Sequence, residues 1–197
     1  LADARLAQEG LAQLRFALAD ASRAQLPEEA DLLFSRFGVM FFDDPTAAFA
    51  HLRRALRPGG RLAFVCWRHP RENPWAMAPL VAARARLGHE SPPADLNAPG
   101  PFAFHDAGRL RAILEAAGLA HVDIAPFDTK VTVGADARTA AETSAKFGPL
   151  SRLMREVGEG RLPEVLDAVA AALGAYAGPD GAVEMAGAAW IVTARRA

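Results

Sequence analysis

Polar and aromatic side chains stand at three points where an apolar run of this chain stops. The first run is followed by Asp20 and Ala21, the second closes with Ser35 and Arg36, and the third closes with Trp67. In an open α/β sheet the carboxyl ends of parallel strands border the ligand crevice, so these residues are candidates for one site. A carboxylate there can accept a hydrogen bond from the amino group of a nucleobase. The alternative for Asp20 is a turn in which its side chain binds its own backbone.

Apolar side chains also occur where a solvated loop is expected. Met40 and Phe41 belong to the run 39–42, and they either wall a cofactor or an apolar acceptor, or cover the end of the sheet as core. Trp67 and Trp75 likewise either line a substrate pocket or belong to the core with satisfied indole N–H groups.

Two histidines are the candidates for a general base. His69 and His105 flank a Pro/Gly-rich loop, and no histidine or cysteine pairs with them at metal-ligand spacing, so no metal site is expected. The chain contains no G-x-S-x-G and no G-x-x-x-x-G-K-[ST] motif. Serine hydrolase and nucleotide phosphoryl chemistry are therefore not expected.

Size and composition are those of one globular domain with room for a helical annex. The chain has 197 residues, of which 51% are hydrophobic and 23% are charged. The net charge of -1 predicts no nucleic-acid partner. The single cysteine, Cys66, fits a reducing compartment, and without a long apolar run or a signal peptide we expect a cytoplasmic protein with no membrane span.

The elements that position these residues read as a βαβ unit. A buried strand at 31–37 is followed by a helix that starts with Asp44 as N-cap and Pro45 at its first position. The sequence predicts that Pro58-Gly59-Gly60 ends this helix and that 61–68 forms the next buried strand. A further strand is predicted at 14–19. Such units build parallel sheets with helices on their faces.

The rest of the chain predicts four helical regions, the first of them near 77–87, and two more strands. A helix begins after Asp106 and stops at Gly118, and the other predicted elements are a strand at 121–133, helices at 137–157 (broken near Gly148-Pro149) and 163–176, and a strand at 182–194. We expect the last two strands to pair antiparallel. The predicted division is an α/β Rossmann-like domain formed by 1–134 and 181–197, with 135–180 as a helical insertion or cap.

In order along the chain, ALADAS, DLLFSRFGVMFF, LRRALRPGG, RLAFVCW and AAWIVTARR resemble class I S-adenosylmethionine-dependent methyltransferases. The resemblance is strongest to the small-molecule branch that includes the ubiquinone/menaquinone-type enzymes. It implies a Rossmann-like sheet that is parallel except for a reversed last strand. It also implies S-adenosyl-L-methionine as cofactor and a small, partly apolar acceptor.

The resemblance also implies roles for individual residues. The cofactor side would consist of Asp20, Ala21, Ser35, Arg36 and Met40. The acceptor side would consist of Phe41, Trp67 and Trp75. It assigns no catalytic residue, so His69 and His105 remain the candidates.

Two features of that family are missing. The glycine-rich loop after the first strand and the acidic residue that ends the second strand do not occur, and Gly59-Gly60 cannot replace the loop because it is expected to end a helix. We therefore expect an N-terminal part of the domain to be absent from this sequence. The alternatives are an NAD(P)-dependent Rossmann oxidoreductase and a degenerate methyltransferase-like binding or dimerisation module.

Overall fold

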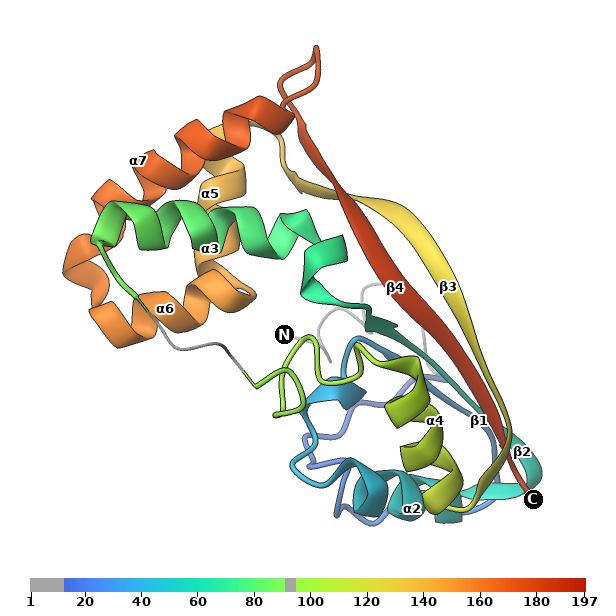
Figure 1. The fold of residues 1–197 in the computed structure, drawn as a ribbon. Coiled ribbons are helices and arrows are strands. Elements are labelled where there is room, and N and C mark those ends of the chain that lie inside the picture. Colours follow the sequence, from blue (N-terminus) through green and yellow to red (C-terminus); the bar gives the residue numbers. More distant parts are fainter. Residues whose placement is uncertain (1–12, 91–94) are drawn as a thin grey trace.

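The computed structural model describes residues 13–90 and 95–197, in which four strands form one mixed sheet of order β1-β2-β4-β3 (Figure 1). The strands are β1 (Ala30–Arg36), β2 (Leu56–Trp67), β3 (Leu119–Gly134) and β4 (Val183–Arg196). β1 and β2 are parallel, whereas β4 runs antiparallel to both β2 and β3. The predicted α/β class, the Rossmann-like sheet and its reversed last strand are confirmed.

Several helices begin or end at the residues that the sequence predicted. They are α2 (Pro45–Ala55), α3 (Pro74–Leu87), α4 (Ala107–Ala116), α5 (Ala137–Lys146), α6 (Pro149–Val157) and α7 (Leu162–Leu173), with 3-10 turns at Val39–Phe41, Pro70–Glu72, Glu159–Arg161 and Gly174–Tyr176. Asp44 caps α2 by accepting a hydrogen bond from the backbone N–H of Ala47 at 2.9 Å. Asp106 caps α4 in the same way. The predicted break near Gly148-Pro149 separates α5 from α6.

The predicted helix stop at Pro58-Gly59-Gly60 is wrong. α2 ends at Ala55, and Pro58-Gly59-Gly60 lies inside β2. β2 bulges at this point. Ala30 of β1 pairs with Leu56, and the next residue of β2 that pairs with β1 comes only after Gly60. A Cβ on Gly60 would lie 2.9 Å from the carbonyl oxygen of Ala30, so glycine is required for close approach of the two strands.

The predicted strand at 14–19 is also wrong. These residues are exposed and irregular, and Leu14, Phe16 and Leu18 pack against nothing that buries them. A strand needs a neighbour that pairs with its backbone N–H and C=O groups. In the described residues no strand lies beside 14–19, so the apolar alternation alone does not produce one.

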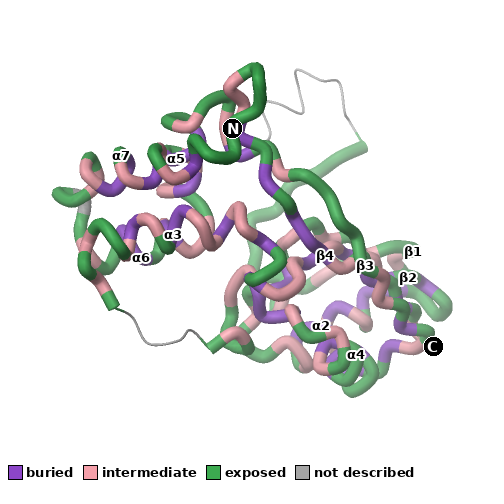
Figure 2. The backbone as a smooth tube through the Cα atoms, turned by 45° about the horizontal axis from the view of Figure 1, so that its top comes forward, coloured by how far each residue is buried: buried purple, intermediate pink, exposed green. Residues whose placement is uncertain are grey.

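Buried side chains form two groups (Figure 2). The first core lies between the sheet and helices α2 and α4, with Phe49, Phe64 and Leu114 at its centre. The second core lies among α3, α5, α6 and α7 and includes Val183 and Met185 from the start of β4. β3 and β4 are long enough to contribute to both cores, since they span 16 and 14 residues (Figure 1).

β1 is an edge strand of the described sheet, and one face of the sheet is left bare. The side chain of Phe34 is 66% exposed, and Leu32 and Ile191 are also exposed. Helices α2 and α4 lie on the opposite face (Figure 1). The sequence predicted a central strand covered on both sides, whereas in the described part of the chain only one side of β1 is covered.

Candidate functional site

The carboxyl ends of β1 and β2 meet at one edge of the sheet. Arg36 pairs with Val65, and the backbone N–H of Phe37 donates to the carbonyl oxygen of Val65 at 3.0 Å. Phe37 has a φ of 58°, in the left-handed region that a bulky side chain rarely adopts. Such strain costs about 1–3 kcal/mol and occurs preferentially at functional sites, so this edge is a candidate site.

Aromatic rings gather at this edge, and we call Phe37, Trp67 and Trp75 the strand-end cluster. Phe37 stacks on Trp67 with ring centroids 4.2 Å apart and an interplanar angle of 13°. Trp75 lies beside Trp67 with centroids 4.7 Å apart. The structure thus brings together two tryptophans that the sequence assigned to the acceptor side.

Met40 joins this cluster from the 3-10 turn after β1. Its side chain is buried, and its Sδ accepts a hydrogen bond of 3.4 Å from the backbone N–H of Trp67. The carbonyl oxygen of Met40 accepts a further bond of 3.0 Å from the backbone N–H of Gly100. Part of the Pro/Gly-rich loop is thereby attached to the end of β1, while residues 91–94 of that loop lie outside the described range.

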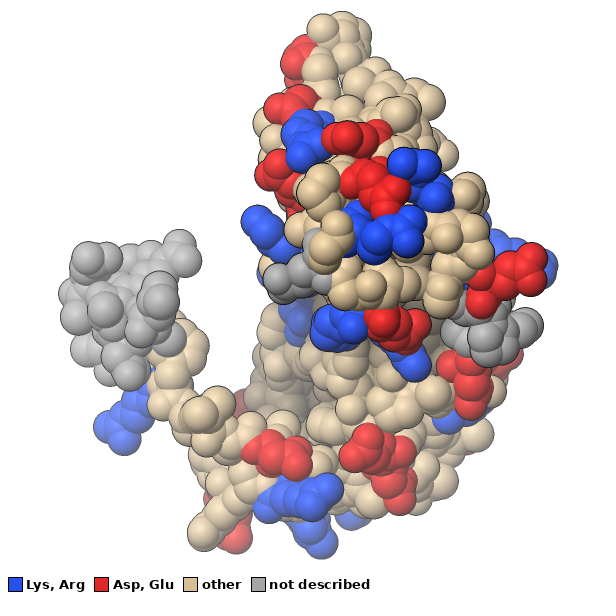
Figure 3. Space-filling model, turned by 90° about the vertical axis from the view of Figure 1, so that its left-hand side faces the viewer, with Lys and Arg blue, Asp and Glu red and all other residues tan. Residues whose placement is uncertain are grey.

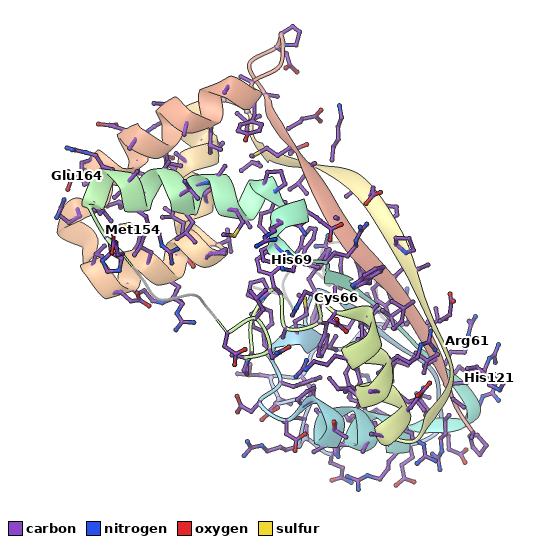
Figure 4. The ribbon with its side chains drawn as sticks, in the orientation of Figure 1. Arg61, Cys66, His69, His121, Met154 and Glu164 are labelled. Atoms are coloured by element: carbon purple, nitrogen blue, oxygen red, sulfur yellow. The ribbon has the colours of Figure 1, made fainter. Side chains whose placement is uncertain are left out.

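The two candidate histidines, far apart in sequence, lie next to each other. The rings of His69 and His105 are 5.4 Å apart in a T-shaped arrangement. His69 lies where the chain leaves β2 for α3, between the two cores (Figure 4). The sequence indicated each histidine separately and did not predict that they face each other.

Hydrogen bonds define complementary tautomers for the neutral pair. Nδ1 of His105 lies 3.0 Å from the carbonyl oxygen of Phe102, and because a carbonyl can only accept, this Nδ1 carries the proton. Nδ1 of His69 accepts from the backbone N–H of Arg71 at 3.2 Å, so its Nε2 carries the proton. His105 therefore has a lone pair at Nε2, and His69 has an N–H donor at Nε2.

Asn73 orients this region, and the sequence analysis missed it. The residue is fully buried, and its Oδ1 accepts hydrogen bonds of 2.9 Å from Nε1 of Trp75 and from the backbone N–H of Ala188. Its Nδ2 donates to the carbonyl oxygens of Ala188 at 3.0 Å and His69 at 3.2 Å. The amide therefore joins the end of β2, the start of α3 and β4. Only its place before Pro74 at a helix start marked it in the sequence.

Arg68 forms a second polar contact network at the end of β2. Its guanidinium lies 5.0 Å from the ring centroid of Trp190 and donates to a carboxylate oxygen of Asp128 at 2.7 Å. It also forms an ion pair with Glu72. The guanidinium holds the end of β2 against β3 and β4.

The other residues assigned to the cofactor side have local contacts. The carboxylate of Asp20 accepts from the backbone N–H of Ser22 at 2.9 Å and from its hydroxyl at 2.7 Å, and these bonds lower the pKa of Asp20. This is the turn that the sequence offered as the alternative. Ala21 and Arg36 are exposed, and Ser35 is half-buried. Their contact with a cofactor stays a prediction, as does contact of the exposed Phe41 with an acceptor.

Cys66 is not a candidate nucleophile. Its side chain is buried in the first core, and burial raises the pKa of its thiol to about 12 (Figure 4). The thiolate is the reactive form, so the group is inert at neutral pH. Residues 13–90 and 95–197 contain no group of three or more metal-ligating side chains. In the same ranges no helix has the length and apolar character that crossing a membrane requires.

A larger hollow of about 830 Å³ lies among α5, α6 and α7. It is lined by residues that include Lys146, Met154 and Leu166. None of its lining residues belongs to the strand-end cluster or to the histidine pair. The hollow is therefore separate from the candidate site.

Comparisons with known proteins agree with this fold. Residues 1–64 match the family described as methyltransferase domain. No curated protein matches the chain. A protein from Bacillus halodurans described as a methyltransferase aligns with a TM-score of 0.56 and 14% identity over 99% of this chain and 77% of its own. The YcgJ protein from Bacillus subtilis aligns with a TM-score of 0.58 and 14% identity over 99% and 76%.

Proposed function

We propose, from the class I methyltransferase fold of this chain, that it belongs to an enzyme transferring a methyl group from S-adenosylmethionine to a small-molecule acceptor. The observation that carries the proposal is the reversed β4, inserted between β2 and β3. The match of residues 1–64 to a methyltransferase domain supports it independently of the fold. The reversed strand argues against the rival NAD(P)-dependent oxidoreductase.

The residues at the end of β1 fit part of such a cofactor. When bound, S-adenosylmethionine supplies an electrophilic methyl group on a positively charged sulfur. The rings of Phe37 and Trp67 stack on each other and are only partly buried, so they offer the electron-rich apolar surroundings that favour a desolvated cation. Ser35, Arg36 and Met40 are the residues of this edge that would hold the methionine portion. We assign the adenine to Asp20 and Ala21, whose turn would have to open for that contact.

The acceptor side is assigned to Trp67, Trp75 and Phe41, with the histidine pair beside them. Nε2 of His105 has the lone pair that can take a proton from the accepting atom, and Nε2–H of His69 can donate to an acceptor oxygen. Asn73 orients Trp75 and the backbone of His69. Transfer by direct displacement depends mainly on this positioning and on exclusion of water.

A small, partly apolar acceptor suits these surroundings better than a nucleic acid. The net charge is -1, and acidic and basic side chains are interspersed on the face shown in Figure 3. We assign residues 135–180, which contain α5, α6 and α7, as a cap that contributes to acceptor choice, and 1–134 with 181–197 as the Rossmann-like domain.

Binding of S-adenosylhomocysteine tests the proposal. A ligand that binds the native state raises the melting temperature, so saturating S-adenosylhomocysteine should stabilise the protein whereas NADH and NADPH should not. Isothermal titration provides the affinity. Stabilisation by a nicotinamide cofactor alone would favour the oxidoreductase. No response to either class of cofactor would favour the binding or dimerisation module.

A further inference from the structure

A small cavity adjoins Trp75, one member of the strand-end cluster. It has a volume of about 130 Å³ and lies between α3, α5 and β3. We call it the Trp75 cavity, and its lining includes Trp75, Ala76, Val131, Thr143, Ser144 and Phe147. The proposed function assigns Trp75 to the acceptor side because of its place near the strand end, and it gives this cavity no role.

The polar groups of the lining have their hydrogen atoms engaged elsewhere. The hydroxyl of Thr143 donates to the carbonyl oxygen of Thr139 at 2.9 Å, and that of Ser144 donates to the carbonyl oxygen of Ala140 at 2.8 Å. The indole N–H of Trp75 donates to Asn73. The hydroxyl of Thr132, also in the lining, donates to Glu184. These four groups therefore offer a ligand no free donor, and the cavity favours an apolar occupant.

The volume matches one ring. An engineered apolar cavity of about 150 Å³ in another protein stays dry and binds benzene, which sets the scale. A cavity of about 130 Å³ accommodates a single aromatic ring or a branched alkyl group. Phe147 is 70% exposed although it lines this cavity, so its ring has free apolar surface for such a group.

Trp75 connects the cavity to the candidate site. Its ring lines the cavity and also lies 4.7 Å from the ring of Trp67, which stacks on Phe37 at the end of β1. The bond from the indole N–H to Asn73 holds the ring where it borders both the cavity and the strand-end cluster. Apolar surface therefore continues from the strand ends to the cavity.

We propose that the Trp75 cavity binds a single apolar ring of the methyl acceptor, so that the accepting atom lies toward the strand-end cluster. That this ring is part of a methyl acceptor rests on the proposed function. The binding of a ring to the cavity does not depend on it.

Benzene is the probe, and its binding is measured by the shift in melting temperature and by protein NMR shifts. Thr143→Leu adds apolar volume to the cavity from α5. Thr139→Leu makes the same change on the same helix at an exposed position outside the cavity. We expect the natural protein and Thr139→Leu to bind benzene and Thr143→Leu to bind it at least about tenfold more weakly. Circular dichroism checks that both variants fold.

The proposal is overturned if saturating benzene shifts neither signal in the natural protein, or if both variants bind it equally. S-adenosylhomocysteine binding is measured on the same proteins. Binding of S-adenosylhomocysteine without benzene rejects the cavity assignment and leaves the proposed function standing. Binding of benzene without S-adenosylhomocysteine supports the ring site and rejects its link to methyl transfer.

Discussion

The two hydrophobic cores of this molecule are packed with different kinds of side chain. In the first core Phe49 lies with its ring centroid 5.5 Å from Phe64 and 5.9 Å from Phe104, so three large rings contact one another beneath the strand ends. In the described residues the buried members of the second core are all aliphatic or methionine. The Trp75 cavity lies at the edge of the second core. Densely packed rings support a rigid edge of the sheet at the candidate site, whereas small side chains between helices leave space that can select a ligand.

The largest expected effect compares one deletion in each core. Phe64→Ala should destabilise the protein by about 3–5 kcal/mol and Leu173→Ala by about 2–5 kcal/mol, because both side chains are fully buried. Urea unfolding followed by circular dichroism measures both. Since β3 and β4 contribute to both cores, we expect one transition that both variants shift. Two transitions, each shifted by one variant only, would show that the cores unfold independently.

The next effect concerns the histidine pair between the cores. If the proposed function holds, His105→Gln should lower the rate of methyl transfer by about 10²–10⁴-fold, because it removes the proposed general base, and leave S-adenosylhomocysteine binding unchanged. The rate is measured with an acceptor found by screening single-ring compounds. His51→Gln, on α2 and bonded to the carbonyl oxygen of Ala24, is the control. Equal rates for the two variants would remove His105 from the mechanism.

Asn73 links the two regions, so its loss should affect both. Asn73→Ala removes the side-chain acceptor of the buried Ala188 N–H, while the Ala188 C=O keeps its bond from the backbone N–H of Arg68, and the loss should cost about 1–3 kcal/mol in unfolding free energy. Tryptophan fluorescence should change in the native state because Trp75 loses its hydrogen bond. Asn97→Ala, at an exposed turn, should change stability by less than about 0.5 kcal/mol. If Asn73→Ala changed neither the unfolding free energy nor the fluorescence, the two cores would not depend on this side chain.

The smallest effect is a pH dependence that arises in the first core alone. Burial raises the pKa of Cys66 from 9.0 to about 12, so between these values the folded protein keeps a proton that the unfolded chain loses. Stability contributed by the protonated thiol is therefore complete below pH 9 and decreases as the pH rises toward 12, by at most about 1.4 kcal/mol per pH unit. Cys66→Ala should show a shallower decline in urea unfolding at pH 8, 9 and 10. If the unfolding free energy of the two proteins declined equally with pH, the raised pKa of Cys66 would be contradicted.

Local signals in the sequence were sufficient for several elements because the causes are local. Asp44 with Pro45 starts α2, Asp106 starts α4, and Gly148 with Pro149 separates two helices, each through hydrogen bonding or backbone restriction within a few residues. Signals that depend on a distant partner failed. The run 14–19 alternates like a strand but has no strand to pair with in the described chain, and Gly59-Gly60 bulges within β2 because it lies against Ala30.

The sequence by itself determined the α/β class, the order of elements from β1 onward and the residues at the ends of β1 and β2. Only the tertiary structure decided that His69 faces His105, that Asn73 ties β2 to β4, and that a ring-sized space opens beside Trp75. The physical reason is the range of the interactions. Caps, turns and apolar periodicity act over a few residues, whereas a site is formed by contacts between segments far apart in the chain, whose meeting depends on the sheet.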